Sequence, residues 1–308
     1  MKRVNLIFLI CVLVTVICGC EQEVKMPVAK SSYPVVYSVL NKDDTAHYVR
    51  LTKTFSGPVD ATIMAQNPDS LYYKNARVFA EMGMTKIEML PTNEIDRDAG
   101  VFITGFNRMY KTTFRLCGNV VIHIFLPDYD TEVIGSTKLV PDLVFTAPDT
   151  LLKKELSFFE TEPVKIIWNG LKNICQTNIR FKYLEVSNSG ADTCYVDWIR
   201  KDCVVVIVPE DLLYHLNAWI GDDPGVRYRK VIGFDILVST GNDQLLDFMT
   251  YKDWVIDYIE KPYSNVINAY GLVASRANGA LLDYQPNHKF IDSLANSRLT
   301  KHLKFVVW

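Results

Sequence analysis

The sequence predicts a mainly β protein with a few short helices, arranged as two successive β-sandwich units. Short segments rich in Val, Ile, Tyr and Phe recur along the chain, with turn residues between them. Hydrophobic residues make up 49% of the chain, which is ample for a large core. Helical periodicity becomes clear only after residue 208. The helices are therefore expected as insertions in the C-terminal half.

Alternation of apolar and polar residues predicts the strands of the first unit, which we assign to residues 33–148. A long loop is expected through Gly57-Pro58 and residues 67–70, and a turn at residues 128–130. The absence of a helical pattern between the strands favours an antiparallel sandwich. The expected strands are residues 34–40, 47–54, 77–82, 86–90, 110–116, 120–126 and 133–140.

The second unit is assigned to residues 149–308 and follows a connection, residues 141–149, that contains two prolines. Trp168 ends an apolar strand and is expected to anchor the core of an immunoglobulin-like or fibronectin-like sandwich. The unbroken apolar run 203–208 predicts a central strand. Further strands are expected at residues 178–186, 193–199, 226–238, 270–275, 280–284 and 303–307.

Three helical segments are expected in this second unit. Pro209 and the two acidic residues after it are typical of a helix start. Residues 242–258 are expected to hold one or two short helices, and residues 288–297 form the last helix. The first helix has one apolar face, which predicts burial of its five members. They are Leu212, Leu213, Leu216, Trp219 and Ile220.

The N-terminal segment predicts export and a lipid anchor. Lys2 and Arg3 precede an apolar run, residues 4–16, that is shorter than the roughly 20 residues of a membrane span. Ile17-Cys18-Gly19 before Cys20 resembles the lipobox of bacterial lipoproteins. We therefore expect a signal peptide, residues 1–19, cleavage between Gly19 and Cys20, and diacylglyceryl and acyl groups (such as palmitate) on Cys20. An ordinary signal peptide or an anchoring helix is the alternative.

Residues 20–32 are expected to form a lipidated tether, and two or more acyl chains make such anchoring stable. Glu21 stands where an inner-membrane retention signal has Asp. Acidic residues at 21–23 resemble the export tag of surface lipoproteins in Bacteroidota-type bacteria. The expected location is the outer membrane, with exposure at the cell surface or in the periplasm left open.

Charge and cysteines limit the partners and the redox chemistry. After signal removal, 31 of the 33 basic residues remain against 35 acidic ones, a net charge of −4 without basic clusters. This excludes an electrostatic footprint for nucleic acid. Export permits disulfides, and four cysteines can join in three complete pairings or stay buried thiols. A hairpin of 193–199 with 203–208 would keep two of them, Cys194 and Cys203, apart. The four are Cys117, Cys175, Cys194 and Cys203.

Motifs for catalysis, metals or cofactors are absent from the sequence. It contains no G-x-S-x-G, no H-E-x-x-H and no glycine-rich phosphate loop. The acidic pairs at 43–44, 128/130 and 222–223 lack the calcium-loop pattern and are expected to be solvated. Tyr72-Tyr73, Trp198, Trp219 and Trp254 are either a platform for sugar or protein contacts or, as we expect, core residues. We therefore predict no catalytic residue, no metal ligand and no cofactor.

Several phrases of the chain, taken together, resemble a known family. They are residues 36–40, 47–51, 54–57, 69–73, 166–168, 270–276, 292–294 and 300–305. The family is an uncharacterised, domain-of-unknown-function group of Bacteroidota-type outer-membrane lipoproteins with immunoglobulin-like β-sandwich domains. The resemblance implies a location and a β-rich fold, and it implies no reaction.

The expected function is that of a non-enzymatic binding or accessory module, held at the outer membrane or cell surface. Its expected partners are the membrane, through the lipid, and an outer-membrane transporter or surface assembly. One alternative is an exported hydrolase acting on carbohydrate or peptide, because a catalytic carboxylate pair need not be adjacent in sequence. The other alternative is a structural stalk.

Overall fold

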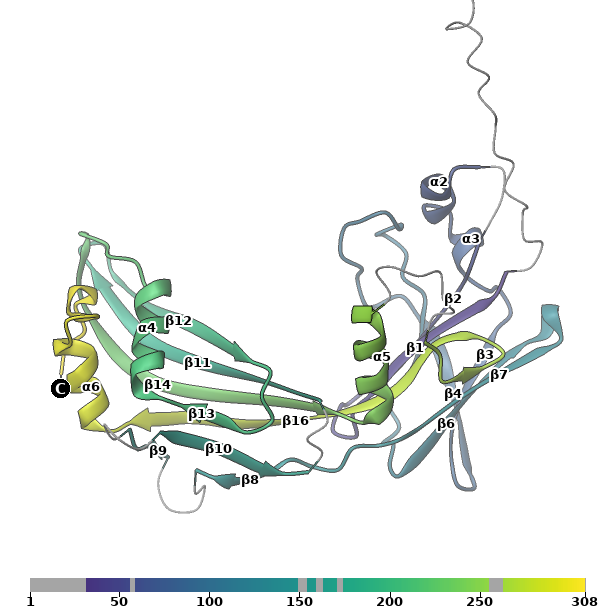
Figure 1. Ribbon diagram of the computed structural model, residues 1–308. Coiled ribbons are helices and arrows are strands. Elements are labelled where there is room, and N and C mark those ends of the chain that lie inside the picture. Colours follow the sequence, from purple (N-terminus) through teal and green to yellow (C-terminus); the bar gives the residue numbers. More distant parts are fainter. Residues whose placement is uncertain are drawn as a thin grey trace, which may run out of the picture.

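The computed structural model describes residues 32–55, 59–148, 154–158, 163–170, 174–254 and 263–307. The protein is mainly β, as predicted, with five short helices in these ranges (Figure 1). The signal peptide, Cys20 and all but the last residue of the tether lie outside the described residues. No helix in the described ranges is long and apolar enough to cross a membrane.

A mixed sheet of 13 strands runs through the described chain, in the order β12-β11-β14-β16-β1-β2-β5-β4-β3-β6-β7-β15, with β9 also paired to β16. Its strands are β1 (Pro34–Leu40), β2 (His47–Lys53), β3 (Arg77–Met82), β4 (Thr85–Thr92), β5 (Met109–Thr112), β6 (Asn119–Leu126), β7 (Thr131–Lys138), β9 (Glu155–Leu156), β11 (Ile174–Ser187), β12 (Ala191–Arg200), β14 (Val226–Gly241), β15 (Val266–Ile267) and β16 (Tyr270–Pro286). A second sheet has the order β13-β10-β8. Its strands are β8 (Val144–Ala147), β10 (Val164–Asn169) and β13 (Val205–Ile207).

Two of the helices lie where the sequence predicted only a loop. Asp60 accepts a hydrogen bond from the Thr62 amide at the start of one, and Asn67 accepts one from the Asp69 amide at the start of the other. These side chains satisfy amides that a helix start leaves free. The helices are α2 (Ala61–Ala65), α3 (Pro68–Leu71), α4 (Pro209–Trp219), α5 (Asp243–Trp254) and α6 (His288–Asn296), with 3₁₀ turns η1 (Pro127–Tyr129) and η2 (Lys301–Leu303).

The half of the molecule that contains β1–β7 is a rolled sheet, which we call the rolled half. The sheet curls until the chain beside β15 meets β16, where the Asn265 side chain donates to the Val273 carbonyl (2.7 Å) and accepts from the Val273 amide (2.9 Å). Gly135 on β7 permits this approach, since a Cβ there would lie 2.5 Å from a Val273 methyl. Alternate residues of each strand face the core inside the roll.

The other half has two layers, and we call it the layered half (Figure 1). β12, β11, β14 and the second part of β16 form one layer, and β13-β10-β8 form the other. Trp168 is fully buried in the core between them, together with Phe181 and Phe234, as the sequence predicted for Trp168. Phe290 and Leu294 of α6 close the end of this core.

β16 joins the two halves as one continuous strand, whereas the sequence predicted two strands at 270–275 and 280–284. Its first part pairs in parallel with β1 and its second part antiparallel with β14. Asn242, just before α5, holds the junction: its amide donates to Thr137 (2.7 Å), and its oxygen accepts from the Ser275 amide (3.2 Å). The division of the chain at residue 148 stays a prediction, and β8, just before it, pairs with β10.

Three sequence predictions about single elements are wrong. Residues 193–199 and 203–208 do not form a hairpin, because β12 pairs with β11 while β13 pairs with β10 in the other sheet. β13 is therefore an edge strand of the small sheet and not a central one. Residues 303–307 contain η2 and a single bridge from Phe305 to Arg229, not a strand.

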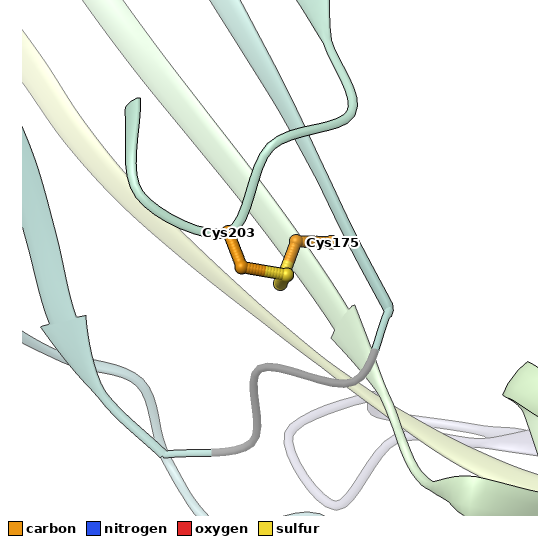
Figure 2. Close-up of a disulfide and its surroundings, with 2 residues drawn as sticks. All are labelled: Cys175 and Cys203. Atoms are coloured by element: carbon orange, nitrogen blue, oxygen red, sulfur yellow. A yellow bond between two sulfur atoms is a disulfide. The ribbon is translucent and has the colours of Figure 1, made fainter. Parts of the chain in front are cut away.

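A disulfide between Cys175 and Cys203 connects the two layers (Figure 2). Cys175 lies at the start of β11, and Cys203 lies where the chain passes from β12 to β13. The two Cα atoms are 5.1 Å apart. Cys117 and Cys194 are free thiols in this structure, so Cys194 and Cys203 do not pair, as expected, although the hairpin behind that expectation is absent.

Candidate functional site

A large hollow lies at the end of the rolled half where the described chain begins. It has a volume of about 750 Å³ and is open to solvent. We call it the tyrosine pocket, because four tyrosines contribute to its lining. Its lining residues are Ser32, Tyr33, Pro34, Tyr73, Leu126, Tyr129, Asp130, Thr131, Glu132, Ser264, Val266, Asn268, Ala269 and Tyr270.

Four separate segments supply these residues, and Tyr73 comes from the chain between α3 and β3. Tyr33 precedes β1 and is fixed to the end of β2, where its amide donates to the Thr54 hydroxyl (2.8 Å) and its carbonyl accepts from the Thr54 amide (2.9 Å). Tyr129 and Asp130 come from the turn after β6, and Asn268 comes from the turn before β16. The pocket therefore exists only because the sheet rolls its two ends together.

The tyrosines are arranged as two edge-to-face pairs. The rings of Tyr33 and Tyr270 are 5.9 Å apart, and those of Tyr73 and Tyr129 are 5.2 Å apart. Tyr33 and Tyr129 are about half exposed, at 51% and 49%, whereas Tyr73 is buried at 4%. Two exposed rings held by two more deeply set ones make a rigid aromatic surface that is open to a ligand.

Burial controls the chemistry of Tyr73. It raises the pKa of the Tyr73 phenol to about 12, while a hydrogen bond with Ser32 lowers it in part. The phenol therefore keeps its proton at neutral pH. The ammonium of Lys53, at the end of β2, lies 5.6 Å from the centre of the Tyr73 ring. This is a cation–π contact that helps to fix the ring.

The polar groups of the pocket lie beside the tyrosines. Asn268 has a left-handed backbone (φ 58°), and its amide donates to the Glu132 carbonyl (2.9 Å). The Glu132 carboxylate is held by the Nδ1 of His123 (2.8 Å). Asp130 also has a left-handed backbone, with φ 45°. Acidic, amide and hydroxyl residues thus line the pocket together with the tyrosines.

This combination suits a polyhydroxylated ligand. Aromatic rings cover the apolar face of such a ligand, and carboxylate and amide groups form hydrogen bonds with its hydroxyls. Small-molecule sites commonly combine an apolar lining with a few polar groups in this way. Among the described residues, no cluster of three or more His, Cys, Asp and Glu side chains could hold a metal ion.

The structure brings together in the tyrosine pocket only two of the described residues that the sequence singled out, and the others lie apart from them. Tyr73 and Asp130 join the tyrosine pocket, while Tyr72 is buried and donates to the Phe106 carbonyl (3.2 Å). Trp198 lies in the layered half, 5.2 Å from the His215 ring. The side chain of Trp254 lies outside the described residues, as do Gly19 and Cys20.

The predicted burial of Trp219 is wrong, since its side chain is 71% exposed. Trp219 has nearly the same angular position on α4 as the buried Leu212, but it is the last residue of the helix. Successive residues of a helix turn by about 100°, so Trp219 lies at the edge of the buried face, on the side of the half-buried His215, and the two rings are 6.0 Å apart. The remaining members of the predicted face, among them Leu216 and Ile220, are buried as expected.

Sequence reasoning missed three of the four pocket tyrosines: Tyr33, Tyr129 and Tyr270. They are far apart in the chain and no spacing relates them. The only available signal was that each stands directly beside a predicted strand end, where loops gather at one edge of a sheet.

Comparison with protein-family profiles finds no match to the chain, and comparison with curated proteins finds no significant match.

Proposed function

We propose that this protein is a lipid-anchored binding module of the outer membrane that holds a saccharide in the tyrosine pocket. The observation that carries the proposal is that two half-exposed tyrosines and two acidic residues, Asp130 and Glu132, line one open pocket. A preformed aromatic surface binds a ligand without ordering new side chains, which keeps the entropic cost of binding low.

The position of the pocket fits an anchored protein. Ser32, which lines the pocket, stands 12 residues after Cys20 in the sequence. Twelve residues reach at most about 40 Å. A lipid on Cys20 would therefore keep the pocket close to the membrane surface, within reach of glycans there and of a neighbouring transporter or surface assembly.

A glycan array tests the binding proposal. The probe is the chain from residue 20 onward with Cys20→Ser, which stays soluble without the lipid. We expect retention on a limited class of saccharides, and loss of that retention when Tyr33→Ala and Tyr129→Ala are combined. Retention on none of the saccharides, or equal retention by the double variant, would count against the proposal.

A globomycin experiment tests the anchor separately. Globomycin blocks the peptidase that processes lipoprotein precursors, so a lipoprotein accumulates in a larger form. We expect this size shift in the wild type and its absence in Cys20→Ser. A wild-type protein that shows no shift would rule out lipidation and leave the saccharide proposal standing.

Hydrolysis is the second candidate, and one observation favours it: Asp130 and Glu132 line the same pocket. A pair of carboxylates on either side of a sugar can cleave a glycosidic bond. Incubation of the array-selected saccharide with the protein decides between the two. Intact saccharide after long incubation fits a binding module, whereas new reducing ends that disappear in Asp130→Asn would establish a hydrolase.

A further inference from the structure

A second pocket lies on the other side of the start of β1, and its chemistry differs from that of the tyrosine pocket. It has a volume of about 510 Å³, and we call it the arginine pocket after Arg50 and Arg97 in its lining. Arg50 projects from β2, and Arg97 comes from the segment between β4 and β5. Lys53 is the third cation of the lining, and Asp98 is the one acidic residue.

The two arginines have no acidic partner among the described residues. Arg50 donates to the Asn107 side chain (3.3 Å), and the guanidinium of Arg97 lies 5.0 Å from the centre of the Phe102 ring. Neither of them forms an ion pair within the described part of the chain, and Asp98 is exposed to solvent. Among the described residues, the lining thus has three cationic side chains and one acidic side chain, and neither arginine is in an ion pair.

Each guanidinium also has a buried nitrogen without a hydrogen-bond partner: Nε of Arg50 and one terminal nitrogen of Arg97. Buried charged donors are expensive to leave unbonded. Burial, and next to it the charge of Arg97, lower the pKa of Arg50. Two like charges therefore belong to one pocket lining, and each guanidinium has a hydrogen-bond donor that the described residues leave unbonded.

The protein holds this arrangement firmly. The Asn107 amide donates to the Ile95 carbonyl (2.8 Å), two residues before Arg97. The Ile103 amide donates to the Ala65 carbonyl (3.1 Å) at the end of α2, which fixes the chain beside Phe102. These two hydrogen bonds fix the backbone before and after Arg97. The position of Arg97 in the pocket is therefore set by the fold.

We propose that the arginine pocket binds the carboxylate of an organic acid whose body is apolar. One guanidinium group bonds a carboxylate through two parallel N–H donors, and the lining of this pocket contains two guanidinium groups. The apolar body would lie against the rings of Phe102 and Tyr37, which are 45% and 41% exposed. This site is separate from the saccharide site and does not depend on it.

Titration calorimetry of the mature chain, carrying Cys20→Ser, tests the assignment with phenylacetate as the probe. We expect binding of one phenylacetate per chain, and much weaker binding of inorganic phosphate and of phenylethanol, which lack the apolar body and the charge respectively. Arg97→Gln should weaken phenylacetate binding about tenfold or more, the equivalent of about 1.4 kcal/mol. Arg298→Gln, which changes an exposed arginine of the layered half, should leave binding unchanged.

A thermal denaturation series guards against a trivial loss of folding. Without ligand, we expect the Tm of Arg97→Gln to equal or exceed that of the wild type, because the substitution removes a like-charge contact with Arg50. Phenylacetate should raise the Tm of the wild type and not that of the variant. No binding up to about 10 mM, which would nearly saturate a 1 mM site, would overturn the proposal. So would equal binding of phosphate, or an equal loss in Arg298→Gln.

Discussion

Cys175 and Cys203 show how one covalent bond fixes the passage of the chain between layers. The bond closes a loop across a sequence separation of 28 residues, and Cys175 is 5% exposed. Cross-linking a loop of this length restricts the unfolded chain, and chain-entropy arguments give a stabilisation of about 3.5 kcal/mol. Exported proteins can keep such bonds.

The first residue-scale prediction concerns this bond. Cys175→Ser should lower the free energy of unfolding by about 3 kcal/mol in urea denaturation under non-reducing conditions. Reduction should bring the wild type to the level of the variant. Cys117→Ser, which changes an exposed free thiol, should alter the free energy by no more than about 0.5 kcal/mol. Equal effects of the two substitutions would contradict a structural disulfide.

His47 supplies a prediction about pH. Its ring is 2% exposed and both nitrogens lack a hydrogen-bond partner among the described residues. Burial lowers its pKa, and the charge of Asp44 opposes this only in part. Below the ordinary histidine pKa of about 6.5, His47 binds a proton in the unfolded chain but stays neutral in the folded chain. The free energy of unfolding should therefore fall as the pH drops from about 7 to about 5.

His47→Leu checks this prediction. The variant should show a shallower loss of stability over the same pH range in urea denaturation, because it can no longer bind that proton. The free energy of unfolding of the variant should still fall somewhat with decreasing pH, since burial lowers the pKa of His215 as well. An unchanged slope in His47→Leu would show that His47 does not contribute.

At the scale of the element, β16 holds the molecule together, and Gly271 makes its pairing with β1 possible. Gly271 has a φ of +127°, and a Cβ at this position would lie 1.8 Å from the Val36 carbonyl oxygen. Val36 and Gly271 are register partners in the parallel pair of β1 and β16. Any side chain at 271 must therefore separate the two strands.

Gly271→Ala should accordingly destabilise the protein by about 3 kcal/mol or more, because the clash with backbone adds to the unfavourable φ. The measurement is thermal or urea denaturation. Gly221→Ala is the matched control, since a Cβ there meets nothing within 4 Å. A stability of Gly271→Ala equal to that of the control would contradict the close pairing of β1 with β16.

Sequence reasoning predicted strands best where one face alone is buried. β1 and β3 match their predicted ranges because alternation marks every residue as inside or outside. The sequence predicted two strands in place of β16, because the polar residues around Asn278 interrupt the apolar pattern. This polar middle is the part of β16 that passes from one core to the other. Trp219 shows the related difficulty in a helix: a residue at the edge of the apolar face can be exposed although the other members of that face are buried.

The tyrosine pocket was beyond the reach of sequence patterns for a different reason. Tyr33 and Tyr270 meet only because β1 and β16 are parallel neighbours, and Tyr129 joins them only because the sheet rolls. Strand order in a sheet of this size depends on long-range pairing. Local periodicity carries no information about it, so the acidic turn at residues 128–130 was recognised as a turn but not as part of a site.

On the scale of the whole molecule, two cores share one sheet and a fixed junction. The Asn242 network ties β7, β16 and the start of α5 together with buried hydrogen bonds. β1 and the tyrosine pocket lie in the rolled half, while α6 and the chain end lie at the opposite end of the layered half (Figure 1).

The central claim is that the tyrosine pocket of an anchored protein binds a saccharide. Titration calorimetry of the array-selected saccharide with three proteins tests it most directly: wild type, Tyr129→Ala and the control Tyr195→Ala, whose ring is 60% exposed on β12. Loss of one contact ring should cost about 1–2 kcal/mol. We therefore predict about 5- to 30-fold weaker binding by Tyr129→Ala, and wild-type affinity for Tyr195→Ala. Wild-type affinity in Tyr129→Ala would contradict the account.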